Sequence, residues 1–201
     1  MEDAARRRTR KTRPAVAWRI AVVLMLICMA GCGVQQLPNQ ITDDEYALYS
    51  AWLTRYSRNH PEQLYISQRT AVFDELLSGN CSRALHDQGK VPWSLIKPLQ
   101  ALGDAQYMLR EYQHRLDVPV AYTMAEQMPL SSHEGFTYVS FSRVVFDRAH
   151  SEALFFFAHS GCEKGSGTQM VCGGGGAVAL HAIKRSGQWQ IEPAQGCMSV
   201  E

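Results

Sequence analysis

The chain has 201 residues, of which 46% are hydrophobic and 19% are charged, and its formal net charge is +1. This composition is ordinary for a folded protein and excludes a globally disordered or collagen-like chain. The length fits one domain or at most two small ones. The basic excess lies in residues 1–31, which carry +5, whereas residues 32–201 carry −4. A nucleic-acid partner is therefore not expected, because the positive charge is confined to one terminal tract.

Residues 1–31 have the three parts of an export signal. A basic tract over 6–13 precedes an apolar run over 20–29, and small residues stand immediately before Cys32. The apolar run is shorter than the roughly 20 residues that span a bilayer. Extending it toward the N-terminus meets Arg19, which is costly at membrane depth. We therefore predict a cleaved signal peptide in preference to a single membrane anchor.

The residues Met29-Ala30-Gly31-Cys32 resemble the lipobox of bacterial lipoproteins, in which Leu is commonest where Met29 stands. In that family the cysteine is lipidated and becomes the new N-terminus. The resemblance implies that Cys32 carries lipid and attaches the protein to a membrane, since several acyl chains suffice for stable anchoring. In Gram-negative members an Asp after the cysteine favours the inner membrane. Gly33 stands there instead, so the resemblance implies the outer membrane, facing the periplasm, for a Gram-negative host.

Once Cys28 has left with the signal, the cysteines other than Cys32 predict a disulfide framework. An even number of them in an exported protein reads as two disulfides, with three pairings possible. We favour Cys162–Cys172, which flank a loop between two predicted strands, and Cys81–Cys197 follows by elimination. A metal site is the weaker alternative, because no CxxC or HxxxH spacing is present. No metal and no cofactor is expected.

Residues 32–40 form a polar tether, and a single domain over 41–201 follows. Thr42 to Glu45 reads as a capping box with acidic residues in the first helical turn. Large apolar side chains then recur at helical spacing, which favours a helix docked on a sheet over an exposed aromatic binding face. These side chains are Tyr46, Leu48, Tyr49, Trp52, Leu53 and Tyr56.

The middle of the chain alternates between helical and strand patterns. Pro119 favours an edge position for the last of these elements, and Pro98 is expected to break or kink one of the helices. The predicted elements are a strand over 63–72, a helix over 73–86 with a possible break at Gly79–Asn80, helices over 92–102 and 104–114, and a strand over 118–124.

The C-terminal part predicts an antiparallel meander. The run EALFFFAH is continuously apolar and should form a central strand buried on both faces. Helices followed by strands give an α+β fold of about four to six strands, with the helices on one sheet face. The predicted elements are a strand over 136–146, a turn over 147–151, a strand over 152–159, a glycine-rich loop over 160–176, and strands over 177–184 and 188–191.

This C-terminal part is similar to a group of uncharacterised exported bacterial proteins, over about residues 136–193. The group combines a serine-arginine strand, an alanine-led apolar strand, a Cys/Gly-rich loop and a Gly-x-Trp hairpin. The resemblance implies the fold and export only, because no activity is established for the group. The matching residues are Phe141-Ser142-Arg143-Val144, Ala153-Leu154-Phe155, Gly161-Cys162, Cys172-Gly173-Gly174 and Gly187-Gln188-Trp189.

The glycine-rich segment GCEKGSGTQMVCGGGG lacks the order of a P-loop and does not open a helix, so a phosphate cradle is not expected. It also lacks the Rossmann order of glycines. A hairpin tip pinned by a disulfide, with glycines at positive φ, is favoured instead. Such a loop is still able to bind a partner, because loops on a rigid sheet often do.

Histidines provide the alternative, catalytic reading. On alternating strands His159 and His181 would face each other across a pair and make a base or metal site with Asp147 or Glu152. A serine hydrolase would also need a nucleophile, and the suggestive serines are Ser160 and Ser166. Neither serine lies in a GxSxG motif. His133 and His150 lie in the same half of the chain.

No coherent active-site motif emerges. The leading hypothesis is a non-catalytic, lipid-anchored envelope protein that binds an envelope protein or peptide through its sheet or disulfide loop. An envelope hydrolase using His159 and His181 is the alternative, and a purely structural accessory is the third. Arg143 is either a solvent-face charge or a buried ion-pair partner.

Overall fold

The structure is a computed structural model that describes most of the predicted domain. For residues 121–123, 164, 170 and 196–200 it describes the backbone alone. The predicted signal peptide and Cys32 lie outside the described residues. Among the described residues, no helix is long and apolar enough to cross a membrane. The described residues are 40–60, 64–71, 73, 79–102, 106–109, 121–123, 135–164 and 170–200.

Helix α2, Asp43–Ser57, begins with the predicted capping box. The hydroxyl of Thr42 accepts a hydrogen bond from the N–H of Glu45 at 3.3 Å. The Glu45 carboxylate accepts one from the N–H of Thr42 at 2.9 Å. All six large side chains of the predicted stripe are buried, which confirms that the stripe is a docking face.

The described residues form a seven-stranded sheet in the order β2-β1-β3-β5-β6-β7, with β4 paired to β5. The strands from β3 to β7 pair antiparallel, as predicted. Strand β1 is parallel to both β2 and β3, because the chain crosses over through two helices before it returns to the sheet. The bounds are β1 Leu64–Ser67, β2 Ala121–Thr123, β3 Phe136–Phe141, β4 Val145–Phe146, β5 Glu152–Lys164, β6 Met170–Arg185 and β7 Gln188–Val200.

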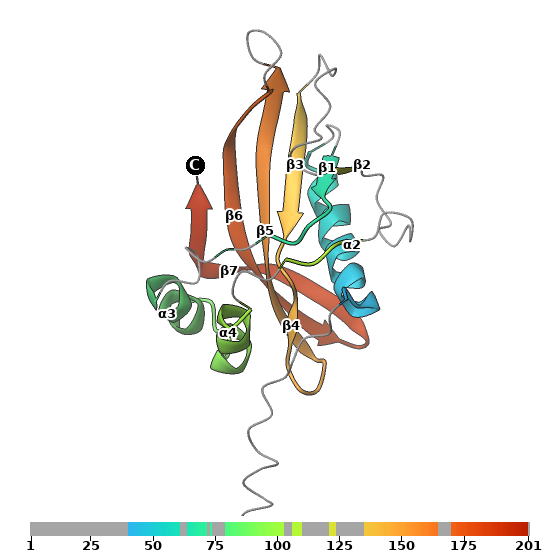
Figure 1. The fold of residues 1–201 in the computed structure, drawn as a ribbon. Coiled ribbons are helices and arrows are strands. Elements are labelled where there is room, and N and C mark those ends of the chain that lie inside the picture. The colour runs from blue at the N-terminus through green and yellow to red at the C-terminus, as the bar shows by residue number, and fades with distance from the viewer. Residues whose placement is uncertain are drawn as a thin grey trace, which may run out of the picture. The chain divides into compact units, whose positions relative to one another are not determined.

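Helices cover both faces of β5, so the expectation that they pack on one sheet face is wrong. Phe155 and Phe157 belong to the cluster of buried side chains under α2. Leu154 and Phe156 belong to a second cluster under α3, Gly79–Asp87, and α4, Trp93–Gln100. Successive side chains on a strand point to opposite faces. A central strand that is apolar on both faces therefore needs cover on both (Figure 1).

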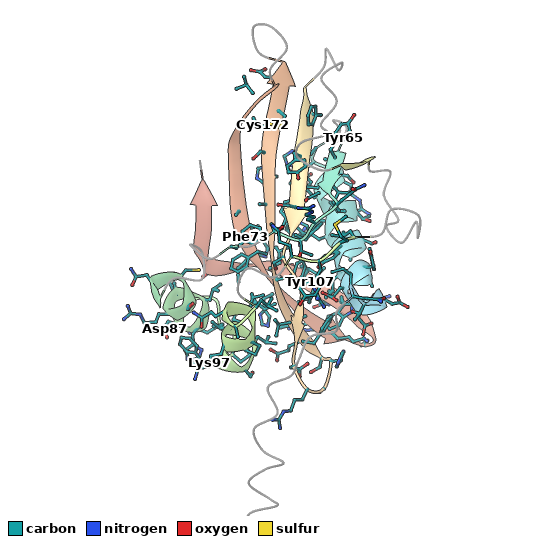
Figure 2. The ribbon with its side chains drawn as sticks, viewed as in Figure 1. Tyr65, Phe73, Asp87, Lys97, Tyr107 and Cys172 are labelled. Carbon is teal, nitrogen blue, oxygen red and sulfur yellow. A yellow bond between two sulfur atoms is a disulfide. The ribbon has the colours of Figure 1, made fainter. Side chains whose placement is uncertain are left out.

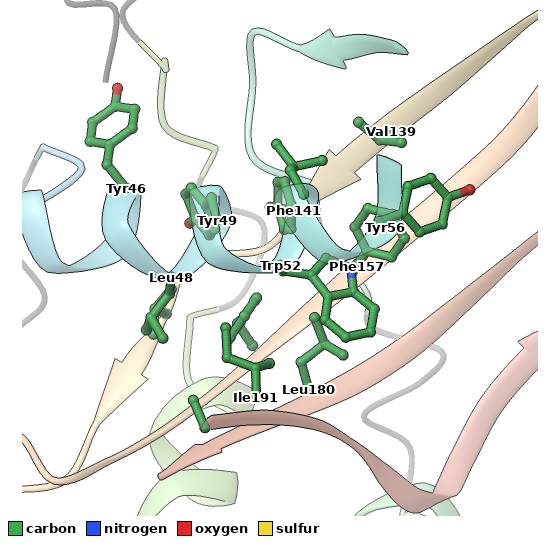
Figure 3. Close-up of a cluster of buried hydrophobic side chains, with 14 of the residues drawn as sticks. Tyr46, Leu48, Tyr49, Trp52, Tyr56, Val139, Phe141, Phe157, Leu180 and Ile191 are labelled. Atoms are coloured by element: carbon green, nitrogen blue, oxygen red, sulfur yellow. The ribbon is translucent and has the colours of Figure 1, made fainter. Parts of the chain in front are cut away.

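Aromatic rings fill the space between α2 and the sheet (Figure 3). The ring of Tyr49 stacks on Phe141 with centroids 4.4 Å apart. Trp52 and Tyr56 meet Phe157 edge to face at 5.7 and 4.9 Å. Offset and edge-to-face pairs of this kind each stabilise the fold by about 0.5–1.5 kcal/mol beyond the effect of burying their surface. These contacts therefore hold α2 firmly on its face of the sheet.

The helix predicted over 104–114 is wrong where the structure describes it. Residues 106–109 are not helical, and Met108 makes an antiparallel bridge to Arg69. The N–H of Tyr107 donates to the hydroxyl of Thr70 at 2.9 Å. The pairing of residues 106–109 with the chain around Arg69 and Thr70 outweighs the modest helical propensity of residues 106–109.

Two other boundaries moved. The strand predicted over 63–72 ends at Ser67, whose hydroxyl accepts from the N–H of Arg69 at 3.2 Å and so turns the chain. The loop predicted over 160–176 is mostly strand, because β5 continues to Lys164 and β6 begins at Met170. Strands pair through backbone hydrogen bonds, which need no side chains, so the glycines did not prevent β5 and β6 from extending.

The strand predicted over 136–146 is interrupted at residues 142–144, and Arg143 is the reason. Its guanidinium donates to the Glu45 carboxylate at 2.7 and 3.2 Å, and each of the two side chains is 1% exposed. The N–H of Val144 donates to the same carboxylate at 3.1 Å. The ring of Tyr107 lies 4.2 Å from the guanidinium carbon. Arg143 is therefore a buried ion-pair partner rather than a solvent-face charge.

Candidate functional site

Cys162 and Cys172 lie directly opposite each other on β5 and β6 and form the predicted disulfide. Figure 2 shows Cys172 near the upper end of this hairpin. Cys81 in α3 is also disulfide-bonded, and α3 packs against β7. Because the side chain of Cys197 lies outside the described residues, the pairing Cys81–Cys197 stays a prediction.

The glycine run forms a bulge in β6. The register passes from His159 opposite Gly176 to Gly161 opposite Gly173, so Gly174 and Gly175 together face a single residue of β5. Gly174 has φ +64°, as the first residue of a glycine bulge requires. A Cβ on Gly175 would overlap the carbonyl oxygen of His159. These two glycines thus serve backbone geometry, as a positive-φ position and a close approach.

His159 and His181 lie on opposite faces of the sheet. His159 follows Phe157 by two residues and shares its face, under α2. His181 is opposite Leu154 and shares the face of α3 and α4. The expectation that the two imidazoles face each other across a strand pair is therefore wrong, because the register places Gly176 opposite His159.

His159 belongs instead to an aromatic group that the sequence did not reveal. Its ring centroid lies 6.2 Å from His60 and 5.7 Å from Tyr56. Tyr56 stacks on His60 at 4.1 Å. Burial, and then the neighbouring His60, lower the pKa of His159, so its ring is neutral at neutral pH. His60 lies beyond the end of α2 at Ser57, so no helical spacing in the sequence pointed to its contact with Tyr56.

His181 and Asp147 have separate partners. The Nε2 of His181 lies 3.3 Å from the Glu152 carboxylate, so this predicted pairing is found. The Asp147 carboxylate accepts hydrogen bonds from the N–H groups of Ser151 and Glu152 at 2.7 and 2.9 Å. Burial alone would raise the pKa of Asp147, but these hydrogen bonds lower it. Asp147 therefore holds the turn between β4 and β5.

Ser160 does not complete a catalytic group with His159. Ser160 neighbours His159 in β5, so its side chain points to the other face of the sheet. Ser166 and His133 lie outside the described residues. His150 lies 3.5 Å from the exposed carboxylate of Asp44. Within the described part of the chain, no group of three or more His, Cys, Asp and Glu side chains is placed to hold a metal ion.

A surface on the face opposite α2 is the strongest candidate for a site. Tyr65 is opposite Tyr138, and Tyr138 is opposite Ser160. In the neighbouring row Ser140 is opposite Ala158, which is opposite Ala177. All of these side chains are partly exposed. We call them the tyrosine–serine face: Tyr65, Tyr138, Ser140, Ala158, Ser160 and Ala177.

The hydroxyl groups of this face are uncommitted. Those of Tyr65, Tyr138, Ser140 and Ser160 make no hydrogen bond to any other described residue. The ring of Tyr65 packs edge to face on Phe136 at 4.7 Å. The tyrosine–serine face therefore offers aromatic surface and free hydroxyls and contains no charged side chain.

The tyrosine–serine face rests on a buried layer and has a lower boundary. Ile66 and Val139, which alternate with its residues on β1 and β3, are fully buried on the α2 side. Below it, Phe73 packs on Phe156 at 5.3 Å, where the cover by α3 and α4 begins. Phe73 lies lower on the sheet than Tyr65 in Figure 2, and α3 and α4 lie at the lower end of β5 and β6 in Figure 1.

Comparison with protein-family models, with curated proteins and with solved structures finds no match to this chain.

Proposed function

We propose that the chain is a non-catalytic binding module of the bacterial cell envelope, held at a membrane by lipid on Cys32. It binds an envelope component through the tyrosine–serine face. The observation that carries the proposal is this surface: partly exposed tyrosine and serine side chains with uncommitted hydroxyls, set in neighbouring rows on a rigid sheet. Loops and faces supported by a rigid scaffold are where binding residues concentrate.

The separation of His159 and His181 favours binding over catalysis. A general base must lie within hydrogen-bonding reach of its nucleophile and of the group that orients it. Ser160 points away from His159, and among the described residues the partner of the His181 imidazole is the Glu152 carboxylate. Among the described residues, the hydrolase alternative therefore lacks a serine hydroxyl placed beside either histidine.

The lipid anchor is tested by metabolic labelling with radioactive palmitate in the bacterial host. The wild type should incorporate the label, and Cys32→Ser should not, because the acylated thiol is gone. Cys81→Ser serves as the matched control and should label like the wild type. Equal labelling of wild type and Cys32→Ser would overturn the anchor.

The binding role is tested by co-sedimentation of the acylated protein, kept in detergent micelles, with the detergent-insoluble wall fraction of the host. The wild type should sediment with this fraction. His159→Ala and His181→Ala should sediment equally well and leave the wall material chemically unchanged. Release of fragments from the wall by wild type alone would favour the hydrolase. No sedimentation of the wild type would favour a structural accessory.

A further inference from the structure

We infer that the ligand of the tyrosine–serine face is an uncharged, β-linked glycan chain. This inference rests on the proposed binding function and names the chemical class that the surface fits. It replaces the protein or peptide partner expected from the sequence, for reasons of size, charge and hydrogen-bonding chemistry.

The tyrosine–serine face is a narrow strip across the strands, because the next side chains on the same face, Phe136 and Cys162 beyond one row and Phe156 beyond the other, are buried. Its two rows cross β1, β3, β5 and β6. At about 4.8 Å between strands and about 7 Å between rows, they cover a strip about 15 Å long and about 7–10 Å wide. A short oligosaccharide lying across the strands matches the strip.

The chemistry of the side chains suits sugar rings. Tyr65 and Tyr138 stand side by side on parallel strands, and each combines an apolar ring with a polar tip. The rings present flat surface to the C–H faces of a pyranose. The free hydroxyls of Ser140 and Ser160 both donate and accept hydrogen bonds, as sugar hydroxyls do. A β-linked chain is extended and flat, so it can contact both rows along its length.

The lack of charged side chains among these six residues argues against a polyanionic ligand. None of the six residues is charged, and binding of nucleic acid or another polyanion depends on Lys and Arg side chains. The residues beneath, Ile66 and Val139, are fully buried and apolar. A neutral ligand therefore meets no unpaired charge on docking.

The test is titration calorimetry of the full, acylated protein in micelles with two uncharged probes, chitotetraose and cellotetraose. At least one should bind. Tyr138→Ala should weaken that binding at least tenfold, because the ring that stacks on the sugar is lost. Tyr138→Phe keeps the ring and loses only the hydroxyl, so it should weaken binding by a smaller factor. Met108→Ala changes an exposed side chain outside the tyrosine–serine face and should bind like the wild type.

Near-ultraviolet circular dichroism checks that each variant is folded, and Ser140→Arg provides a second, independent block of the surface if Tyr138→Ala does not fold. Absence of binding to both probes, or binding that Tyr138→Ala and Ser140→Arg leave unchanged, would overturn the glycan proposal. If the wall fraction still retained the wild type in that case, the binding role would stand and its ligand would be a wall-bound protein.

Discussion

Glu45 and Arg143 connect residues that are far apart in the sequence. The Glu45 carboxylate caps its own helix and accepts hydrogen bonds from the Arg143 guanidinium and from the N–H of Val144. The hydroxyl of Tyr49 donates to the carbonyl of Ser142 at 2.7 Å in the same place. Burial, and then the Glu45 charge, raise the pKa of Tyr49 well above its usual value, so it remains a donor at any physiological pH.

Breaking this buried pair should be costly. Glu45→Gln leaves the Arg143 guanidinium buried without a countercharge, and loss of one partner of a buried pair costs about 3–5 kcal/mol. The free energy of unfolding from urea denaturation measures the loss. The matched control is Glu192→Gln, which removes a surface ion pair to Arg55 at 3.3 Å whose side chains are 72% and 54% exposed. Such a pair contributes about 0–1 kcal/mol. Equal losses in the two variants would contradict a structural role for the buried pair.

Acidification should destabilise the contact between the end of α2 and β5. The pKa of His159 is lowered in the folded state, so the unfolded chain binds the proton more readily. The stability that the neutral ring provides is therefore complete above about pH 6.5, the ordinary histidine pKa, and is lost as the pH falls below it.

Urea denaturation at pH 7.5 and 5.5 checks this dependence. The wild type should lose free energy of unfolding at the lower pH, and His159→Gln should lose less. His150→Gln, which changes an exposed histidine, should retain the wild-type dependence. Asp147 does not contribute to this change in stability between pH 7.5 and 5.5. Hydrogen bonds lower its pKa, so the stability that its carboxylate provides is lost only below about pH 4. An unchanged pH dependence in His159→Gln would contradict the assignment.

At the scale of elements, sequence patterns correctly predicted the features of helices and strands that are set by residues close together in the chain. The capping box and the aromatic stripe of α2 are present as predicted, because both are set by residues three or four apart. The hairpin of β5 and β6 was predicted too short, because strand pairing through glycine leaves no side-chain pattern. The segment around Met108 was predicted as a helix, and its pairing with Arg69 is a tertiary contact.

Because of the bulge in β6, Gly173 and Gly175 differ in the space available for a Cβ atom. Gly175→Ala would place a Cβ against the carbonyl oxygen of His159 and the hydroxyl of Ser160, whereas a Cβ on Gly173 meets nothing within 4 Å. Gly175→Ala should destabilise the protein by about 1–3 kcal/mol, the usual cost of overpacking. Gly173→Ala should be close to neutral. Thermal unfolding of the two variants measures the difference, and equal midpoints would refute the bulge geometry.

At the scale of the molecule, the sheet brings together side chains that no local pattern connects. Tyr65 and Tyr138 become neighbours only through the parallel pairing of β1 with β3, and the sequence indicated an antiparallel meander alone. For His159 and His181 the outcome is the opposite. The alternation of side chains along the strands suggested that they face each other, but the strand register places them on opposite faces of the sheet. The α+β fold and the disulfide Cys162–Cys172 were predictable, since both depend on residues close in sequence.

Co-sedimentation of Ser140→Arg with the detergent-insoluble wall fraction tests the central claim, binding through the tyrosine–serine face, most directly. Ser140 lies beside Tyr138 and Ala158 on the face, and its hydroxyl makes no hydrogen bond to another described residue, so an arginine there adds bulk and charge at the surface. Ala149→Arg, in the exposed turn before β5, is the control. The account predicts wall affinity at least tenfold weaker for Ser140→Arg and unchanged for Ala149→Arg. Wild-type affinity in folded Ser140→Arg would contradict it.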